Sequence, residues 1–286
     1  SEGDFKNLRL ALDAGADADA RASLDEDQKS ALMYASANGH AQVAHCLIEA
    51  KATVNLEDNR RYTALHYAAM DGRDAAVVDL LINSNSSVTA LNKFGHTPLY
   101  CAVQGGDVTC IKILASHSVD IIDAVENEGW TALSYAAFQG CIDVMRCLVE
   151  ANASVNSENG HDTALNVAVR KNHVGVVQYL ISAKARTDIG PHSALQVAAV
   201  EGNIAVAKYL VEHACARIDG VGSSTTATPL EISSEKMNVQ MIKYLTAQRA
   251  DVARMFAPRM RDAPEESLCD EGREIRRIFS AQVRTS

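Results

Sequence analysis

Residues that could carry chemistry are scattered through this chain of 286 residues and form no complete motif. Cys141 and Cys147 stand six residues apart on one predicted helix, a spacing that does not bring two thiolates to one face for zinc. Gly220-Val221-Gly222 resembles a fragment of a phosphate-binding loop, but no strand precedes it and G-x-G-x-x-G is incomplete. No Ser/His/Asp arrangement and no pair of carboxylates stands out. We therefore expect no enzyme activity, no metal site and no cofactor.

The composition predicts a soluble helical protein rather than a nucleic-acid-binding or membrane protein. Hydrophobic residues make up 47% of the chain and aromatic residues only 5%, so small aliphatic side chains must fill the core. The net charge of −9 argues against nucleic acid or an anionic membrane as partner. Seven cysteines, an odd number without C-x-x-C, indicate reduced thiols inside the cell. We expect a cytoplasmic or nuclear monomer.

A repeat explains where the helices must lie. The pattern Ser or Thr, then Ala or Pro, then Leu occurs seven times, and the spacing of its leucines averages 33 residues. The leucines are Leu32, Leu65, Leu99, Leu133, Leu165, Leu195 and Leu230. Each Ser or Thr is suited to cap a helix, and Pro98 and Pro229 fit its first position. A first helix is therefore predicted to start in every unit.

Each first helix has a predicted stop and a predicted partner. Nine residues after most caps stands a glycine, which readily takes the left-handed conformation that ends a helix. Asn172 replaces it in the fifth unit, and Met237 in the seventh, where we expect Asn238 to take that conformation instead. An apolar pattern such as VVDLLI at 77–82 then predicts a second helix, and Asn-, Asp- and Gly-rich connectors follow. The unit is helix, turn, helix, extended loop.

This unit resembles the ankyrin repeat from about residue 3 to residue 252. TALHYAA at 63–69, HTPLY at 96–100 and GHAQVA at 39–44 are similar to the family consensus. The resemblance implies an all-α ankyrin-repeat solenoid with a capping half-repeat at 1–24, seven repeats at 25–253, and a linker with an amphipathic helix at 254–286. We favour that helix folding back on the array over docking to a partner. The family also makes His66 and the turn residues His40 and His173 structural.

The resemblance implies a non-enzymatic scaffold or adaptor that binds another protein on the concave face of the array. An alternative is the recognition or regulatory arm of a larger enzyme or channel. Loop tips and first-helix ends carry the contacts in such proteins, which here gives Arg60, Arg61, Tyr62, Met70, Phe94, His96, Trp130 and Phe138, extended by Arg170 and Lys171. The four basic residues favour a partly acidic partner segment with apolar anchors. The competing interpretation is that the rings pack against neighbouring loops.

Two asparagines are candidates for modification. Asn55 and Asn156 each follow a valine in a loop, eight residues after a leucine, and so resemble the sites that are hydroxylated in some ankyrin proteins. A plain turn asparagine is the favoured interpretation of both.

Overall fold

The computed structural model describes residues 2–21, 27–71, 73–157, 162–219, 227–248 and 270–283. Gly72, the Gly-Val-Gly segment at 220–222 and the predicted linker at 254–269 lie outside these ranges. Within these ranges, the regular elements are all helices, and two isolated β-bridges are the only β structure. None of the described helices is long and apolar enough to cross a membrane. The described part divides into two compact units, one up to Ser154 and one from Val155 onward.

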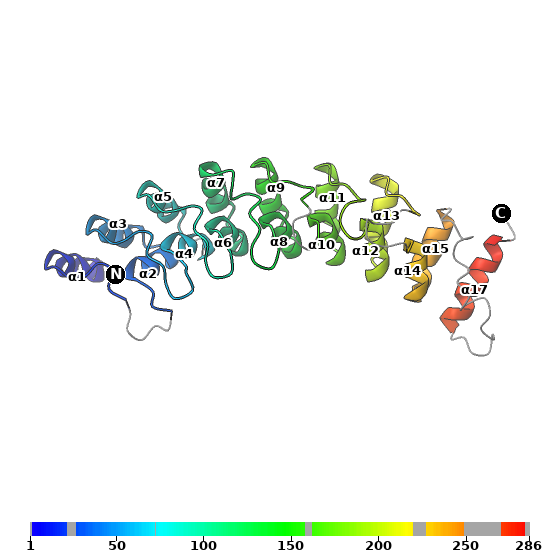
Figure 1. Cartoon of the computed structure of the whole chain (residues 1–286), viewed down its shortest axis with the longest axis horizontal. Coiled ribbons are helices and arrows are strands. Elements are labelled where there is room, and N and C mark those ends of the chain that lie inside the picture. Colours follow the sequence, from blue (N-terminus) through cyan, green and yellow to red (C-terminus); the bar gives the residue numbers. More distant parts are fainter. Residues whose placement is uncertain are drawn as a thin grey trace. The chain divides into compact units, whose positions relative to one another are not determined.

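The first unit stacks helical hairpins. It starts with α1 (Glu2–Asp13), and its first helices are α2 (Ala31–Ala37), α4 (Ala64–Asp71), α6 (Pro98–Gly105) and α8 (Ala132–Gln139). The second helices are α3 (Ala41–Glu49), α5 (Ala75–Asn83), α7 (Val108–His117) and α9 (Ile142–Glu150). Figure 1 shows them as two rows within this unit, each helix contacting its equivalent in the next hairpin.

The second unit repeats the arrangement and ends in a further helix. Its hairpins are α10 (Ala164–Arg170) with α11 (Val174–Ser182), α12 (Ala194–Glu201) with α13 (Ile204–His213), and α14 (Pro229–Glu235) with α15 (Val239–Ala247). The final helix α17 (Asp270–Val283) packs on α15 (Figure 1), with Ile275 fully buried and Glu274 paired with Lys243. This contact favours the interpretation that the helix folds back on the array.

Most of the predicted caps form as expected. Before six of the first helices, the side chain of the Ser or Thr accepts a hydrogen bond from the backbone N–H three residues on, at 3.1 Å for Thr97 and 3.3 Å for Ser30. Pro98 and Pro229 occupy the first turn of their helices. The leucine that follows each cap is buried, which places the capped end of every first helix in the core.

The helix stops correct one prediction. Gly106 and Gly140 have φ of 78°, and Asn172 follows with φ of 57°, as expected for a left-handed stop. Met237 also adopts φ of 57°, whereas Asn238 has φ of −83° and its side chain caps α15 through Met241 N–H. The expectation that Asn238 would take the left-handed position was wrong, because that residue is needed as the cap of the next helix.

Replacing Met237 with glycine is therefore expected to stabilise the protein. A side chain in the left-handed region costs about 1–2 kcal/mol, part of which is offset by the greater freedom of glycine in the unfolded chain, so we expect a gain of about 0.5–1 kcal/mol. Urea unfolding measures it. Asn238→Gly is the matched control and should destabilise, since it removes the cap; the reverse pair of signs would contradict the assignment.

Four of the cysteines are buried in the core. Cys46, Cys101, Cys110 and Cys147 are buried free thiols, and burial raises the pKa of Cys101 to about 12. Cys215, in contrast, is exposed.

Candidate functional site

In the loops before three of the first helices, the same side-chain-to-backbone hydrogen bond fixes the loop tip. A polar side chain five residues before the cap accepts a hydrogen bond from the backbone N–H of the residue just before the cap. The pairs are Asp58 with Tyr62, Asn92 with His96, and Glu126 with Trp130, at 2.8, 3.0 and 2.7 Å. Three large rings are thereby placed at the same position of three successive loops.

These rings belong to a continuous aromatic row in the first unit. The chain has one Trp, five Phe and eight Tyr, and seven of these residues stand in this row together with His96, so the aromatic side chains are concentrated here. Ring centroids are 4.5 Å apart for His96 and Tyr100 and 5.5 Å for Trp130 and Phe138. Its members are Tyr62, Tyr67, Phe94, His96, Tyr100, Trp130, Tyr135 and Phe138.

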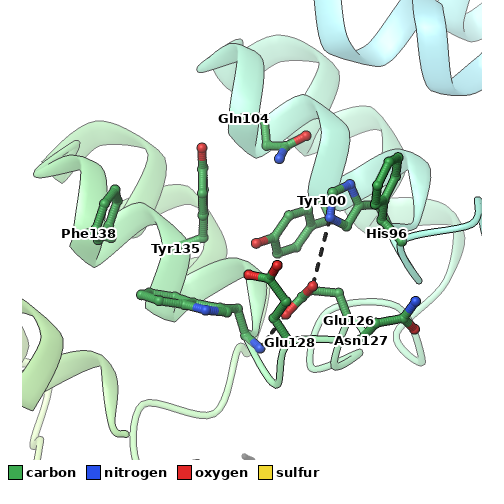
Figure 2. Close-up of a pocket in the computed structure, with 10 residues that line it drawn as sticks. His96, Tyr100, Gln104, Glu126, Asn127, Glu128, Tyr135 and Phe138 are labelled. Atoms are coloured by element: carbon green, nitrogen blue, oxygen red, sulfur yellow. Dashed lines mark hydrogen bonds and ion pairs between the residues drawn. The ribbon is translucent and has the colours of Figure 1, made fainter. Parts of the chain in front are cut away.

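A pocket of about 390 Å³ opens in this row, between the loops and first helices of the third and fourth hairpins. Figure 2 shows Tyr100 and Tyr135 rising from α6 and α8, with the acidic loop residues beneath them and Gln104 on the opposite side. Phe94, His96, Tyr100, Gln104, Glu126, Asn127, Glu128, Trp130, Tyr135 and Phe138 line it. A pocket of this size holds a side chain or a small group rather than a whole domain.

The pocket is acidic. Glu126 is almost fully buried. One of its carboxylate oxygens accepts a hydrogen bond from Trp130 N–H, and the other lies 3.9 Å from His96 Nε2 (Figure 2). Glu128 is exposed at the rim. Burial lowers the pKa of His96, and the two carboxylates oppose that shift only in part, so the imidazole is neutral at neutral pH. None of the ten lining residues is a lysine or arginine.

The aromatic residues predicted to contact a partner differ in exposure. Phe94 and Phe138 are 47% and 39% exposed, as a contact surface requires. Trp130 is half-buried. Tyr62, in contrast, is only 9% exposed, and burial raises its pKa to about 12. Its ring packs between Tyr67 and Phe94, so the prediction of an exposed tyrosine is corrected.

The basic residues predicted at this surface are engaged within the chain. Arg60 pairs with Asp27 at 2.9 Å, and Arg61 with Glu57 at 3.1 Å. Arg170 pairs with Asp162 at 2.7 Å, and Lys171 also interacts with other residues of the chain. These contacts weaken the argument for an acidic partner, because each arginine already has a carboxylate beside it. Met70 is half-buried and does not line the pocket.

Sequence reasoning did not identify six of the ten pocket residues, which are Tyr100, Gln104, Glu126, Asn127, Glu128 and Tyr135. Tyr100 occupies the position of His66 in the repeat, which the consensus treats as internal, and it is indeed 5% exposed while one side faces the pocket. The two glutamates stand in the ENEGW segment at 126–130, where acidic residues directly before the single tryptophan were an available signal.

The remaining candidate residues have structural roles. His66 accepts a hydrogen bond from Thr63 N–H at Nδ1 and donates from Nε2 to His96 C=O, at 3.1 Å each, and burial lowers its pKa to about 4. Asn55 and Asn156 link neighbouring loops, each through both atoms of its amide, for example Asn156 to Lys184 C=O and Arg186 N–H. Hydroxylation at these residues stays a prediction, which the intact mass of the native protein tests. No three His, Cys, Asp or Glu side chains in the described part could hold a metal.

Comparison with known proteins decides the family. The sequence model for ankyrin repeats (3 copies) matches residues 1–92, 71–159, 122–190 and 165–255, which together cover most of the chain. The chain belongs to the ankyrin repeat family. The solved ankyrin repeat domain of Bcl-3, an IkappaB protein, has the same fold, with a TM-score of 0.66 over 76% of this chain and all of that domain, at 23% identity. Ankyrin repeats are generally protein-interaction modules.

Part of this sequence is similar to segments of several different curated proteins. The ankyrin repeat and KH domain-containing protein mask-1 of Caenorhabditis elegans is 30% identical over 64% of this chain and 8% of its own length. A transient receptor potential cation channel subfamily A member 1 homolog of the same organism is 29% identical over 58% and 14%. The tyrosine-protein kinase HTK16 of Hydra vulgaris is 29% identical over 45% and 17%. This ankyrin chain therefore spans only a small part of the relatives it matches.

Proposed function

We propose that this ankyrin chain is a non-enzymatic scaffold or adaptor that holds a partner polypeptide on the face formed by the loop tips and first helices of its second to fourth hairpins. The observation that carries the proposal is the aromatic row, which includes two exposed phenylalanines, Phe94 and Phe138, that line an open pocket. Exposed aromatic side chains around a cavity are typical binding anchors. The odd number of cysteines favours the cytoplasm or nucleus as the compartment of the protein. Imaging of a tagged copy tests this.

Phe138→Ala is expected to weaken capture of the partner by about 2 kcal/mol without unfolding the array, because a ring that is already 39% exposed contributes little to the core. The measurement is affinity purification from the native cell followed by quantitative mass spectrometry and titration of the captured protein. Adding Trp130→Ala should deepen the loss.

The matched control is Val200→Ala. Val200 stands seven residues after its cap, as Phe138 does, and is 38% exposed, but it belongs to the second unit and lies outside the aromatic row. It should leave capture unchanged. Equal effects of the two substitutions, or loss of helical signal in Phe138→Ala, would show that the binding surface lies elsewhere.

A second candidate is the recognition or regulatory arm of a larger enzyme or channel. Similarity to a cation channel homolog and a tyrosine kinase, each of which this chain matches over less than a fifth of its length, favours it. The full-length reading frame tests this candidate, which requires a catalytic or membrane segment beside the repeats.

A further inference from the structure

The pocket combines two features that together suit a positive charge. Three rings line it: those of Tyr100 and Tyr135, which project from α6 and α8 (Figure 2), and that of Trp130 from the loop before α8. Two carboxylates, Glu126 and Glu128, stand on one side of it. The faces of aromatic rings carry negative charge that attracts ammonium and guanidinium groups, and a nearby carboxylate adds direct Coulomb attraction.

The same chain already holds a lysine in an arrangement of this kind. Lys29 Nζ lies 5.1 Å from the ring centroid of Tyr67, 5.8 Å from that of Tyr34 and 3.7 Å from a carboxylate oxygen of Asp27. Tyr34 and Tyr67 stand four residues after their caps, as Tyr135 does, and Asp27 stands three residues before its cap, as Glu128 does. Lys29 itself takes the position that Trp130 holds in the fourth repeat, directly before the cap.

The first two hairpins therefore bind their own ammonium group between tyrosines and a carboxylate. In the third and fourth hairpins the rings and carboxylates are present, but a tryptophan replaces the lysine and no cationic residue lines the pocket. A cationic group bound in this pocket would therefore come from outside the pocket lining.

We propose that this pocket receives the cationic side chain of a lysine or arginine from an extended segment of the partner, with Glu128 as its ion-pairing group. The inference rests on the proposed partner-binding function and reverses the expected sign of the partner's charge. Glu126 contributes charge, but its carboxylate is committed to Trp130 N–H, so the exposed Glu128 is the residue that meets the ligand. The net charge of −9 also steers a basic segment toward the chain.

The probe is a phage-displayed library of randomised eight-residue peptides, selected on the immobilised whole chain. We expect lysine or arginine to be enriched at one position by about fivefold or more, the size of a combined cation–aromatic and ion-pair preference. Resynthesised peptides should bind about fivefold more weakly when that residue is replaced by norleucine, which keeps the aliphatic stem. Binding should change the fluorescence of Trp130, the only tryptophan in the chain.

Two variants separate pocket contact from overall charge. Glu128→Gln should weaken binding of the selected peptides about fivefold. Glu150→Gln removes an equal charge from α9, the second helix of the fourth hairpin, and should change binding less than twofold. Selected peptides that perturb Trp130 but show no basic preference, or that bind Glu128→Gln normally, would overturn the cationic pocket and leave the proposed function standing. Peptides that neither perturb Trp130 nor respond to Phe138→Ala would overturn both.

Discussion

His66→Ala is expected to lower the free energy of unfolding by about 3 kcal/mol, because it removes a fully buried side chain that joins two hairpins. Thr63 N–H loses its acceptor, His66 Nδ1, and His96 C=O loses the hydrogen bond from His66 while keeping the one from Asn92 N–H. A cavity in the core adds to this cost. Denaturant unfolding measures the change, and because His96 lines the pocket, partner binding should also weaken.

The chain supplies its own control for this substitution. Gln196 occupies the position of His66 in the sixth repeat, accepts from Ser193 N–H at 2.8 Å and donates to Ala227 C=O at 2.5 Å. His66→Gln should therefore keep both hydrogen bonds and cost about 1 kcal/mol or less. A glutamine variant as unstable as the alanine variant would show that the bridge depends on the imidazole ring itself.

The same histidine makes stability depend on pH. Its pKa is about 4 in the folded chain, because burial disfavours the imidazolium, against about 6.5 in the unfolded chain. The unfolded state therefore binds the proton first as the pH falls. Stability from this group is complete above about pH 6.5 and is lost toward pH 4, by up to about 3 kcal/mol. His66→Gln should flatten the pH dependence of unfolding over this window, and an unchanged slope would exclude His66 as its source.

Much of the fold follows from the repeat alone. A cap, a buried leucine and a helix stop that recur every 33 residues on average leave few alternatives to stacked helical hairpins, and the structure confirms the capping hydrogen bond at six of the seven predicted positions. Asn172 was correctly expected to replace glycine, because one residue had to end the helix there. Met237 shows the limit of such reasoning: propensity favoured Asn238, but two helices compete for that asparagine and the second one has it.

The site was less accessible to sequence reasoning, because its properties arise between repeats. Arg60 lies 33 residues from Asp27, which is one repeat away, so its ion pair could not be seen within a single unit. Tyr62 and Trp130 share a position in the unit, yet one is buried and the other lines a pocket, since their neighbours in the adjacent loops differ. The expected sign of the partner's charge depended on these neighbours.

Gly105→Ala is expected to destabilise the protein by about 3 kcal/mol, although the same change in an ordinary helix is stabilising by up to about 1 kcal/mol. Gly105 ends α6 and faces the preceding first helix, α4. A Cβ atom added there would lie 2.0 Å from the carbonyl oxygen of Met70 and 3.0 Å from its carbonyl carbon. Because the atom in the way belongs to the backbone, no side-chain rotation relieves the contact, and the two helices must separate.

Gly106→Ala tests whether this cost comes from packing or from the backbone. Its added Cβ would meet nothing within 4 Å, but its φ of 78° is left-handed, so strain alone should cost about 1–2 kcal/mol. Thermal and denaturant unfolding of both variants should place Gly105→Ala clearly below Gly106→Ala in stability. Since Gln104 precedes Gly105 and lines the pocket, separation of α4 and α6 should also weaken partner binding, whereas Gly106→Ala should leave it intact. A Gly105→Ala variant as stable as the parent chain would mean that α4 and α6 do not pack at this distance.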